Sequence, residues 1–215
     1  MPIEDVFDLG EHLRDGLWRV GSASLGDLRG VPGVALAGEP EALAAARLAL
    51  AGLSKPVTFG EPPAEGALVV CLSYDGHDPS ALEALAGARG PVVAATTGGP
   101  LAAQAREAGQ KVVPIPAGFT PRSAVGYWVA ITCELLARAG AQPSREAEIE
   151  AAAEAVEELA SRWSGPDVEA AELAETLDAA RALVLGDEDS ALRRALSVVL
   201  LLDAVTFHLG SLARI

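Results

Sequence analysis

The stretch Ala67-Leu-Val-Val-Cys-Leu72, followed at once by Ser73-Tyr-Asp-Gly76, decides the fold. Six consecutive apolar residues without alternation are typical of a strand that is buried on both faces, as in a parallel sheet. The polar, glycine-containing turn that follows marks the carboxyl end of this strand. The sequence therefore predicts a central parallel strand with a loop at its carboxyl end.

Four further short apolar runs are bounded by Gly or Pro in the same way. With residues 67–72 they make five strand candidates, the others being residues 33–37, 56–59, 91–95 and 111–115. Helices are expected over residues 41–52, 79–88, 101–108 and 121–139. Because strands alternate with helices and parallel crossovers are right-handed by default, we predict an α/β fold with a doubly wound parallel sheet in the order 2-1-3-4-5.

Three segments are expected along the chain. Residues 1–30 form an N-terminal helical segment, residues 31–140 hold the sheet, and residues 141–215 form a helical tail. In the tail, apolar residues recur at steps of three and four from Ile149 to Trp163, which predicts an amphipathic helix. Most of the acidic excess also lies in this tail, and we interpret it as a solvated helical face.

The composition excludes several function classes. The chain has a formal net charge of −14 and only two lysines, so it lacks the basic surface that nucleic acid or an anionic membrane would attract. The longest apolar stretch, residues 195–209, is interrupted by Asp203 and His208 and is shorter than the roughly 20 residues of a membrane span. The acidic start is unlike a signal peptide. We therefore expect a cytoplasmic protein.

Both cysteines stand in apolar runs, Cys71 within a predicted strand and Cys133 within a predicted helix. A chain of this length needs no disulfide, and the cytosol does not favour one. A catalytic thiol is the less favoured alternative. We predict that both are reduced, buried, small core residues.

Three loops carry the chemistry, namely residues 72–80, 95–100 and 116–127. Small hydroxyl residues and glycines before a helix let backbone N–H groups approach an anion. In the third loop, Thr120 is an expected N-cap, Pro121 suits the first helical position and Arg122 follows it. Turn and capping chemistry explains any one loop, but three at one sheet edge favour an anionic ligand. The predicted ligand-binding residues are Ser73, Thr96, Thr97, Gly98, Gly99 and Arg122.

At these residues the sequence resembles the sugar isomerase (SIS) domain, and within it the bifunctional phosphoglucose/phosphomannose isomerases. The resemblance covers about residues 31–140 and implies a five-stranded SIS fold that binds a phosphorylated sugar. It also implies that Ser73 is among the phosphate donors and that Arg122 lines the sugar pocket. The matching residues are Ser73, Tyr74 and Gly76, then Thr96, Gly98 and Gly99, then Pro116, Gly118, Pro121, Arg122, Gly126 and Tyr127.

The sequence also departs from this family. The family has a glycine-and-serine loop after the first strand, and this sequence has Gly38-Glu-Pro-Glu41 there instead. In the next loop, Asp75 and Asp78 replace a serine and a threonine of the family pattern. Carboxylates repel a phosphate and remove hydrogen-bond donors. The family's second SIS domain supplies a base and a ring-opening histidine. The segment after residue 140 is too short to hold a second SIS domain. We therefore expect no catalytic residues and degenerate or absent isomerase activity.

His77 lies between Asp75 and Asp78, and this cluster admits two interpretations. It could be a general-base pair or a metal site, or it could be a capped, solvated turn. Spacing of this kind is weak support for a metal, so the turn is favoured. We predict no metal and no cofactor.

Two function classes remain. The favoured one is a non-catalytic SIS module that binds a sugar phosphate or a similar small anion. The alternative is a divergent glucose-6-phosphate or mannose-6-phosphate isomerase whose active site is completed across a homodimer, with Glu39, Glu41 or His77 as the base. A homodimer is expected in either case, because the apolar helices over residues 121–139 and 192–209 need more cover than one small domain gives.

Overall fold

The computed structural model describes residues 8–61 and 64–163 of the 215-residue chain. The chain forms two compact units. The sheet unit comprises residues 15–146, and the terminal unit combines residues 1–14 with residues 147–215. The sheet unit contains every strand of the described chain and all three predicted loops.

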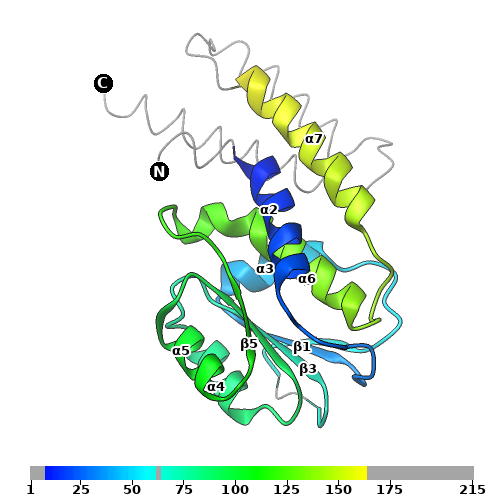
Figure 1. Cartoon of the computed structure of the whole chain (residues 1–215). Coiled ribbons are helices and arrows are strands. Elements are labelled where there is room, and N and C mark those ends of the chain that lie inside the picture. Colours follow the sequence, from blue (N-terminus) through cyan, green and yellow to red (C-terminus); the bar gives the residue numbers. More distant parts are fainter. Residues whose placement is uncertain (1–7, 62–63, 164–215) are drawn as a thin grey trace. The chain divides into compact units, whose positions relative to one another are not determined.

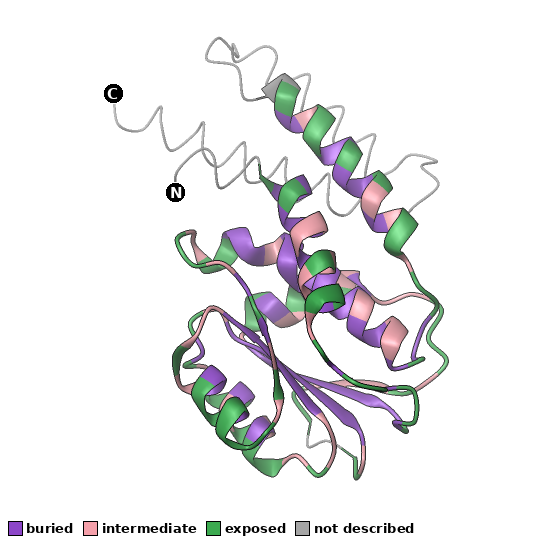
Figure 2. Ribbon diagram, in the orientation of Figure 1, coloured by how far each residue is buried: buried purple, intermediate pink, exposed green. Residues whose placement is uncertain are grey.

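The sheet has five strands, all parallel, in the order β2-β1-β3-β4-β5. This confirms the predicted α/β class and strand order. The strand bounds are β1 (Val34–Gly38), β2 (Val57–Phe59), β3 (Leu68–Leu72), β4 (Val92–Thr96) and β5 (Lys111–Pro114). Every residue of β1, β3 and β4 is buried, as the unbroken apolar runs indicate for central strands (Figure 2).

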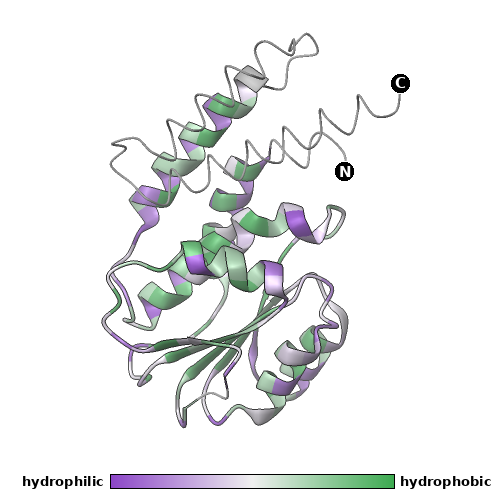
Figure 3. Cartoon of the chain, turned by 180° about the vertical axis from the view of Figure 1, so that it is seen from behind, coloured by the Kyte–Doolittle hydropathy of each residue, from purple (hydrophilic) through white to green (hydrophobic). Residues whose placement is uncertain are grey.

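Two layers of helices cover the sheet (Figure 1). One layer consists of α4 (Pro79–Gly87) and α5 (Gly99–Glu107), and the other contains α3 (Pro40–Leu48) and α6 (Val125–Arg138). The helix predicted to start at residue 121 instead begins with a 3-10 turn, η1 (Pro121–Ala124), before α6. The strands between the layers are the hydrophobic centre of the unit (Figure 3), and both faces of the central strands β1, β3 and β4 are removed from water.

The core on the α4 and α5 side is built from small and branched residues. Val69, Cys71 and Ala94 of the sheet pack with Leu85 of α4 and Leu101 of α5. Both cysteines of the chain are free and buried, which confirms the prediction for them. Burial raises the pKa of the Cys71 thiol to about 12, so this thiol stays protonated at neutral pH.

Helix α2 (Leu9–Ser22) contributes residues to both units. Within the sheet unit its Gly16 lies against α6, because a Cβ placed on Gly16 would be 2.9 Å from the Cβ of Ala130. The Tyr127 hydroxyl also donates a hydrogen bond to the Asp15 carboxylate over 2.8 Å. The cover that α6 needs is therefore supplied within the chain at this point. The other helix invoked for a homodimer, residues 192–209, lies outside the described residues, and the homodimer stays a prediction.

A single lysine ties three segments of the sheet unit together. The half-buried Lys55 donates hydrogen bonds to the carbonyl oxygens of Arg29 (2.6 Å), Val31 (2.8 Å) and Ala139 (2.6 Å). The first two carbonyls precede β1, and the third follows the end of α6. One ammonium group thus satisfies three backbone acceptors that helix and sheet leave unpaired.

The terminal unit is described over residues 8–14 and 147–163. Helix α7 (Glu146–Trp163) buries Ile149, Ala152 and Val156, which confirms the predicted apolar stripe there. In the same unit Arg14 pairs with Glu150 over 2.8 Å and with Glu157.

Other tail predictions fall outside the described chain. The part of the predicted helical tail after residue 163 lies outside the described residues, and the segment boundaries at residues 30 and 140 remain predictions. Among the described helices, none has the length and apolar character needed to cross a membrane.

Candidate functional site

The predicted loops follow β3, β4 and β5 at the carboxyl edge of the sheet. Because carboxyl ends of parallel strands share one edge, residues 73–78, 97–98 and 115–120 lie along the same side. Glu39, the residue after β1, lies at this edge as well. The structure thus places Ser73 in the loop after β3, and it places Thr96, Thr97, Gly98 and Gly99 from the last residue of β4 to the first residue of α5. Arg122 lies on the η1 turn that follows the third loop.

The loops after β3 and β4 are bonded to each other through their backbones. The Thr97 N–H donates to the Tyr74 carbonyl oxygen over 2.8 Å. The buried Thr96 hydroxyl lies 3.2 Å from that carbonyl oxygen and 3.0 Å from the Gly98 carbonyl oxygen, and it accepts a hydrogen bond from the Gly98 N–H. The contacts of Thr96 shape the two loops, while Thr97 and Gly98 are only partly buried at the edge.

This close approach requires a glycine at position 76. Gly76 has a φ of +77°, and a Cβ there would lie 2.2 Å from the Gly98 carbonyl oxygen. Any side chain would both strain the left-handed backbone and separate the loops. The positive φ and the close contact with Gly98 therefore give a physical reason for the glycine that matches the SIS pattern at this position.

An aromatic ladder joins the third loop to the first. The Tyr74 hydroxyl donates to the Phe119 carbonyl oxygen, and the two ring centroids are 5.4 Å apart. The Phe119 ring stacks on Tyr127 with centroids 5.7 Å apart and planes inclined by 4°. Sequence reasoning matched Tyr74 and Tyr127 to the family pattern but missed Phe119. The available signal was three aromatic residues around one predicted edge in a chain that is only 4% aromatic.

The third loop leads into α6 through the predicted Thr120 and Pro121. Thr120 occupies the N-cap position, but its hydroxyl pairs with the Ser123 hydroxyl at 2.9 Å and caps no backbone N–H. Pro121 takes a first-turn position of η1, as predicted, and Arg122 is exposed on this turn. An exposed guanidinium at the edge can engage a ligand's hydroxyl or anionic oxygens.

The Ser73 hydroxyl, a predicted phosphate donor, is already engaged inside the protein. Ser73 is fully buried, and its Oγ donates to Oε1 of Glu39 over 2.8 Å. The Tyr74 N–H donates to the same carboxylate oxygen, also over 2.8 Å. Two donors of the first loop thus converge on a carboxylate of the chain itself.

The environment of Glu39 changes its proton affinity. Burial of the half-buried carboxyl is the main cause that raises its pKa above the ordinary value of 4.5. The hydrogen bonds from Ser73 and Tyr74 act in the opposite direction, and the nearby Asp75 and Asp78 carboxylates raise the pKa further. The net result is a carboxyl group whose pKa is raised.

The cluster around His77 is a capped turn. Oδ1 of Asp78 accepts hydrogen bonds from the Ala81 N–H (2.9 Å) and the Ser80 hydroxyl (2.6 Å), so Asp78 is the N-cap of α4. The exposed Asp75 carboxylate accepts from the His77 N–H over 2.9 Å. This is the interpretation that the sequence favoured. Across residues 8–61 and 64–163, no three His, Cys, Asp or Glu side chains gather as a metal site.

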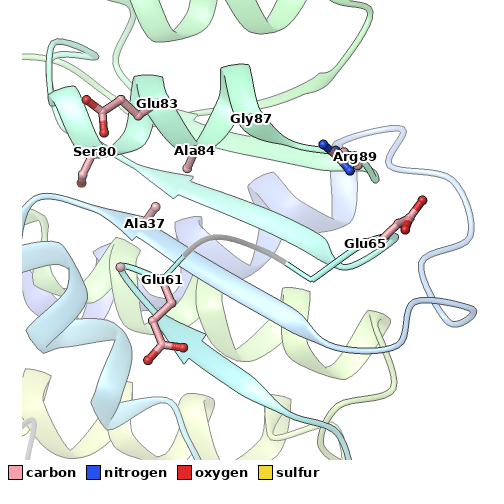
Figure 4. Close-up of a pocket in the computed structure, with 9 residues that line it drawn as sticks. Ala37, Glu61, Glu65, Ser80, Glu83, Ala84, Gly87 and Arg89 are labelled. Atoms are coloured by element: carbon pink, nitrogen blue, oxygen red, sulfur yellow. The ribbon is translucent and has the colours of Figure 1, made fainter.

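A separate groove of about 440 Å³ lies beside α4, above β1 (Figure 4). Glu83, Ala84 and Ser80 face it from α4, and Ala37 from β1 (Figure 4). None of the predicted ligand-binding residues lines it. Its lining residues are Ala37, Gly60, Glu61, Glu65, Ser80, Glu83, Ala84, Gly87 and Arg89.

No protein-family model matches the sequence, and no curated protein matches it. Solved structures do match. A Salmonella typhimurium LT2 protein with a provisional sugar-binding assignment aligns with 84% of this chain at 24% identity and a TM-score of 0.53. A Bacillus subtilis protein with a provisional phosphosugar isomerase assignment aligns with 81% at 18% identity and a TM-score of 0.51.

The chain has an SIS-type fold. This confirms the fold that the sequence resemblance implied. The chain spans only 60% and 56% of the lengths of these two proteins.

Proposed function

We propose that this chain is an SIS-type binding module that takes a sugar derivative at the carboxyl edge of its sheet. The observation that carries the proposal is the loop frame, by which we mean residues 73–78, 97–98 and 115–120 joined by the Thr97–Tyr74 and Tyr74–Phe119 hydrogen bonds. A rigid frame at this edge is where open α/β sheets bind ligands. The sugar-binding and phosphosugar assignments of the structural neighbours support this ligand class.

The ligand contacts are proposed from the surface of the loop frame. Thr97 and Gly98 are partly exposed, and Gly99 opens α5. Their hydroxyl and backbone N–H groups suit the oxygens of a sugar, and Arg122 supplies a charged donor from the third loop. Ser73 and Thr96 act as positioning residues behind this surface, because both are buried and bonded within the protein.

We propose that hexose-phosphate isomerisation is absent or vestigial. The reaction needs a base that moves a proton between adjacent carbons and an acid–base group that opens the ring. At this edge Asp78 caps α4, and Glu39 accepts two hydrogen bonds from the loop frame. These carboxylates are used to hold the loops, which supports binding rather than turnover. The relation to phosphoglucose/phosphomannose isomerases is likewise a proposal.

One observation favours the alternative, a divergent aldose–ketose isomerase completed across a homodimer. The raised pKa of Glu39 moves its carboxyl group toward the range of a general base. In that case a second protomer would supply the ring-opening group.

Calorimetry with glucose, glucosamine and glucose 6-phosphate tests the proposed function. We expect binding of at least one of them, weakened roughly tenfold or more in Arg122→Ala and unchanged in Arg106→Ala. Arg106 is a matched control because it is also exposed but lies in the last turn of α5, away from the carboxyl edge. Equal binding by both variants, or none by the wild type, contradicts the proposal. Conversion of glucose 6-phosphate to fructose 6-phosphate at ordinary enzymatic rates supports the alternative.

A further inference from the structure

The Ser73 hydroxyl has its proton directed at Glu39. A serine hydroxyl carries one proton and two lone pairs. Its Oγ accepts hydrogen bonds from the Gly76 N–H (3.1 Å) and the Asp78 N–H (3.3 Å), which use both lone pairs. The proton therefore points at Oε1 of Glu39, 2.8 Å away. The whole hydrogen-bonding capacity of this side chain is consumed within the protein.

The same carboxylate oxygen also receives the Tyr74 N–H over 2.8 Å. A hydroxyl and a backbone N–H that converge on one anionic oxygen form the kind of donor set that holds a phosphate or carboxylate oxygen. Here the anion is part of the chain. An external anion at this loop must first displace Glu39 from both donors.

Glu39 is held in place by the sheet. Its N–H donates to the Leu72 carbonyl oxygen over 3.1 Å, and Pro40 starts α3 directly after it. Gly38 approaches β3 so closely that a Cβ on it would lie 1.8 Å from that same carbonyl oxygen. The position of the carboxylate therefore follows from the packing of β1 against β3.

Displacement would also be opposed by charge. Asp78 flanks the Ser73 hydroxyl through its N–H contact, and Asp75 precedes Gly76 in the same loop. With Glu39 ionised, this short loop faces three carboxylates, and each repels an incoming phosphate.

We infer that Glu39 is a built-in anion that fills the donor set of the Ser73 loop, so the sugar derivative bound at this edge has no phosphate on that loop. This deepens, and rests on, the sugar-derivative binding proposed above. Glu39 is then the specificity-determining residue against phosphorylated ligands. Its removal is sufficient to open an anion site, because the donors are already in position.

Phosphate binding by Glu39→Ser tests this inference directly. Inorganic phosphate and glucose 6-phosphate are titrated against the wild type, Glu39→Ser, Glu39→Ser/Ser73→Ala and Glu41→Ser, with ionic strength matched by chloride. We expect Glu39→Ser to bind phosphate roughly tenfold or more tightly than the wild type. The gain should vanish when Ser73 is also replaced. Glu41→Ser is the matched control, since Glu41 is an exposed carboxylate two residues away, and it should resemble the wild type.

The inference is overturned if the wild type binds phosphate as tightly as Glu39→Ser, or if the folded variant shows no gain. Should Glu39→Ser fail to fold by circular dichroism, Glu39→Gln takes its place. Glutamine keeps an acceptor oxygen for the Ser73 and Tyr74 donors, which favours folding. Because it removes the negative charge that opposes phosphate, it must also gain phosphate affinity, and no gain overturns the inference. Binding of unphosphorylated glucose or glucosamine is recorded in the same series. Its loss in Arg122→Ala tests the proposed function separately, whatever the phosphate result.

Discussion

The Tyr74 hydroxyl donates a hydrogen bond to the Phe119 carbonyl oxygen across 2.5 Å, and this contact joins the loop after β3 to the loop after β5. These two loops are separated by β4 in the sheet, so no strand pairing holds them together. The stacking of Phe119 on Tyr127 extends the connection to α6. The geometry of the candidate site therefore depends on side chains as well as on the sheet.

The first prediction is that Tyr74→Phe weakens ligand binding more than its effect on stability suggests. The variant keeps the ring contact and loses one hydrogen bond, for an expected loss of about 1 kcal/mol in the free energy of unfolding. The loop after β5 should become more mobile, so the affinity for the sugar derivative should fall. Urea melts and calorimetry measure the two effects.

Tyr127→Phe is the matched control for that experiment. It also loses one tyrosine hydrogen bond, but the partner is Asp15 of α2 and no loop of the candidate site. Its stability should fall by a similar amount while its ligand affinity stays close to the wild type. If the two variants lose affinity equally, the Tyr74–Phe119 bond has no special role in the site.

The second prediction concerns Glu39→Gln and pH. The pKa of Glu39 is raised in the folded protein from 4.5, chiefly by burial, so the folded state binds this proton more tightly than the unfolded chain does. The resulting stability is fully present below pH 4.5 and is lost as the pH rises through the raised pKa. Glutamine does not titrate. Relative to the wild type, Glu39→Gln should therefore gain stability between about pH 4 and pH 7.

Urea melts of both proteins at the two pH values measure this difference. The control is Glu41→Gln, an exposed carboxylate of the same segment, whose stability difference from the wild type should change less with pH. A Glu39→Gln variant that loses stability relative to the wild type as the pH rises would show that hydrogen bonding outweighs burial at this carboxyl group.

The sequence predicts much of the sheet and of the position of the candidate site. The unbroken apolar runs gave the parallel strands, and the order 2-1-3-4-5 makes β1 and β3 neighbours, so the residues that follow them must meet. The register pairs Gly38 with Leu72 and brings Glu39 beside Ser73. The sequence pattern singles out both residues but does not predict their contact, because the hydrogen bonds of Ser73 depend on the rotation of its side chain. The same holds for Phe119, whose carbonyl contact depends on the path of a loop that periodicity does not describe.

The third prediction is that Lys55→Met destabilises the sheet unit. The variant keeps the apolar stem but leaves three backbone carbonyl oxygens, those of Arg29, Val31 and Ala139, without their donor. We expect a loss of about 1 to 3 kcal/mol in the free energy of unfolding. Lys111→Met is the control, because Lys111 is the other lysine and is exposed on β5. Equal stabilities of the two variants would mean that the three carbonyls are satisfied as well by water.

The fourth prediction compares two glycines of α2. Alanine is normally the better helix residue by about 0.5 to 1 kcal/mol, so Gly21→Ala, whose Cβ would meet no atom within 4 Å, should stabilise the protein or leave it unchanged. At Gly16 the new Cβ would lie 2.9 Å from the Cβ of Ala130. The helices must then move apart, at an expected net cost of about 1 to 3 kcal/mol. Thermal melts of both variants measure the difference, and a stabilising Gly16→Ala would show that α2 is not packed closely on α6. Restoring the space with Gly16→Ala/Ala130→Gly should recover part of the loss, which an effect of helix propensity alone would not do.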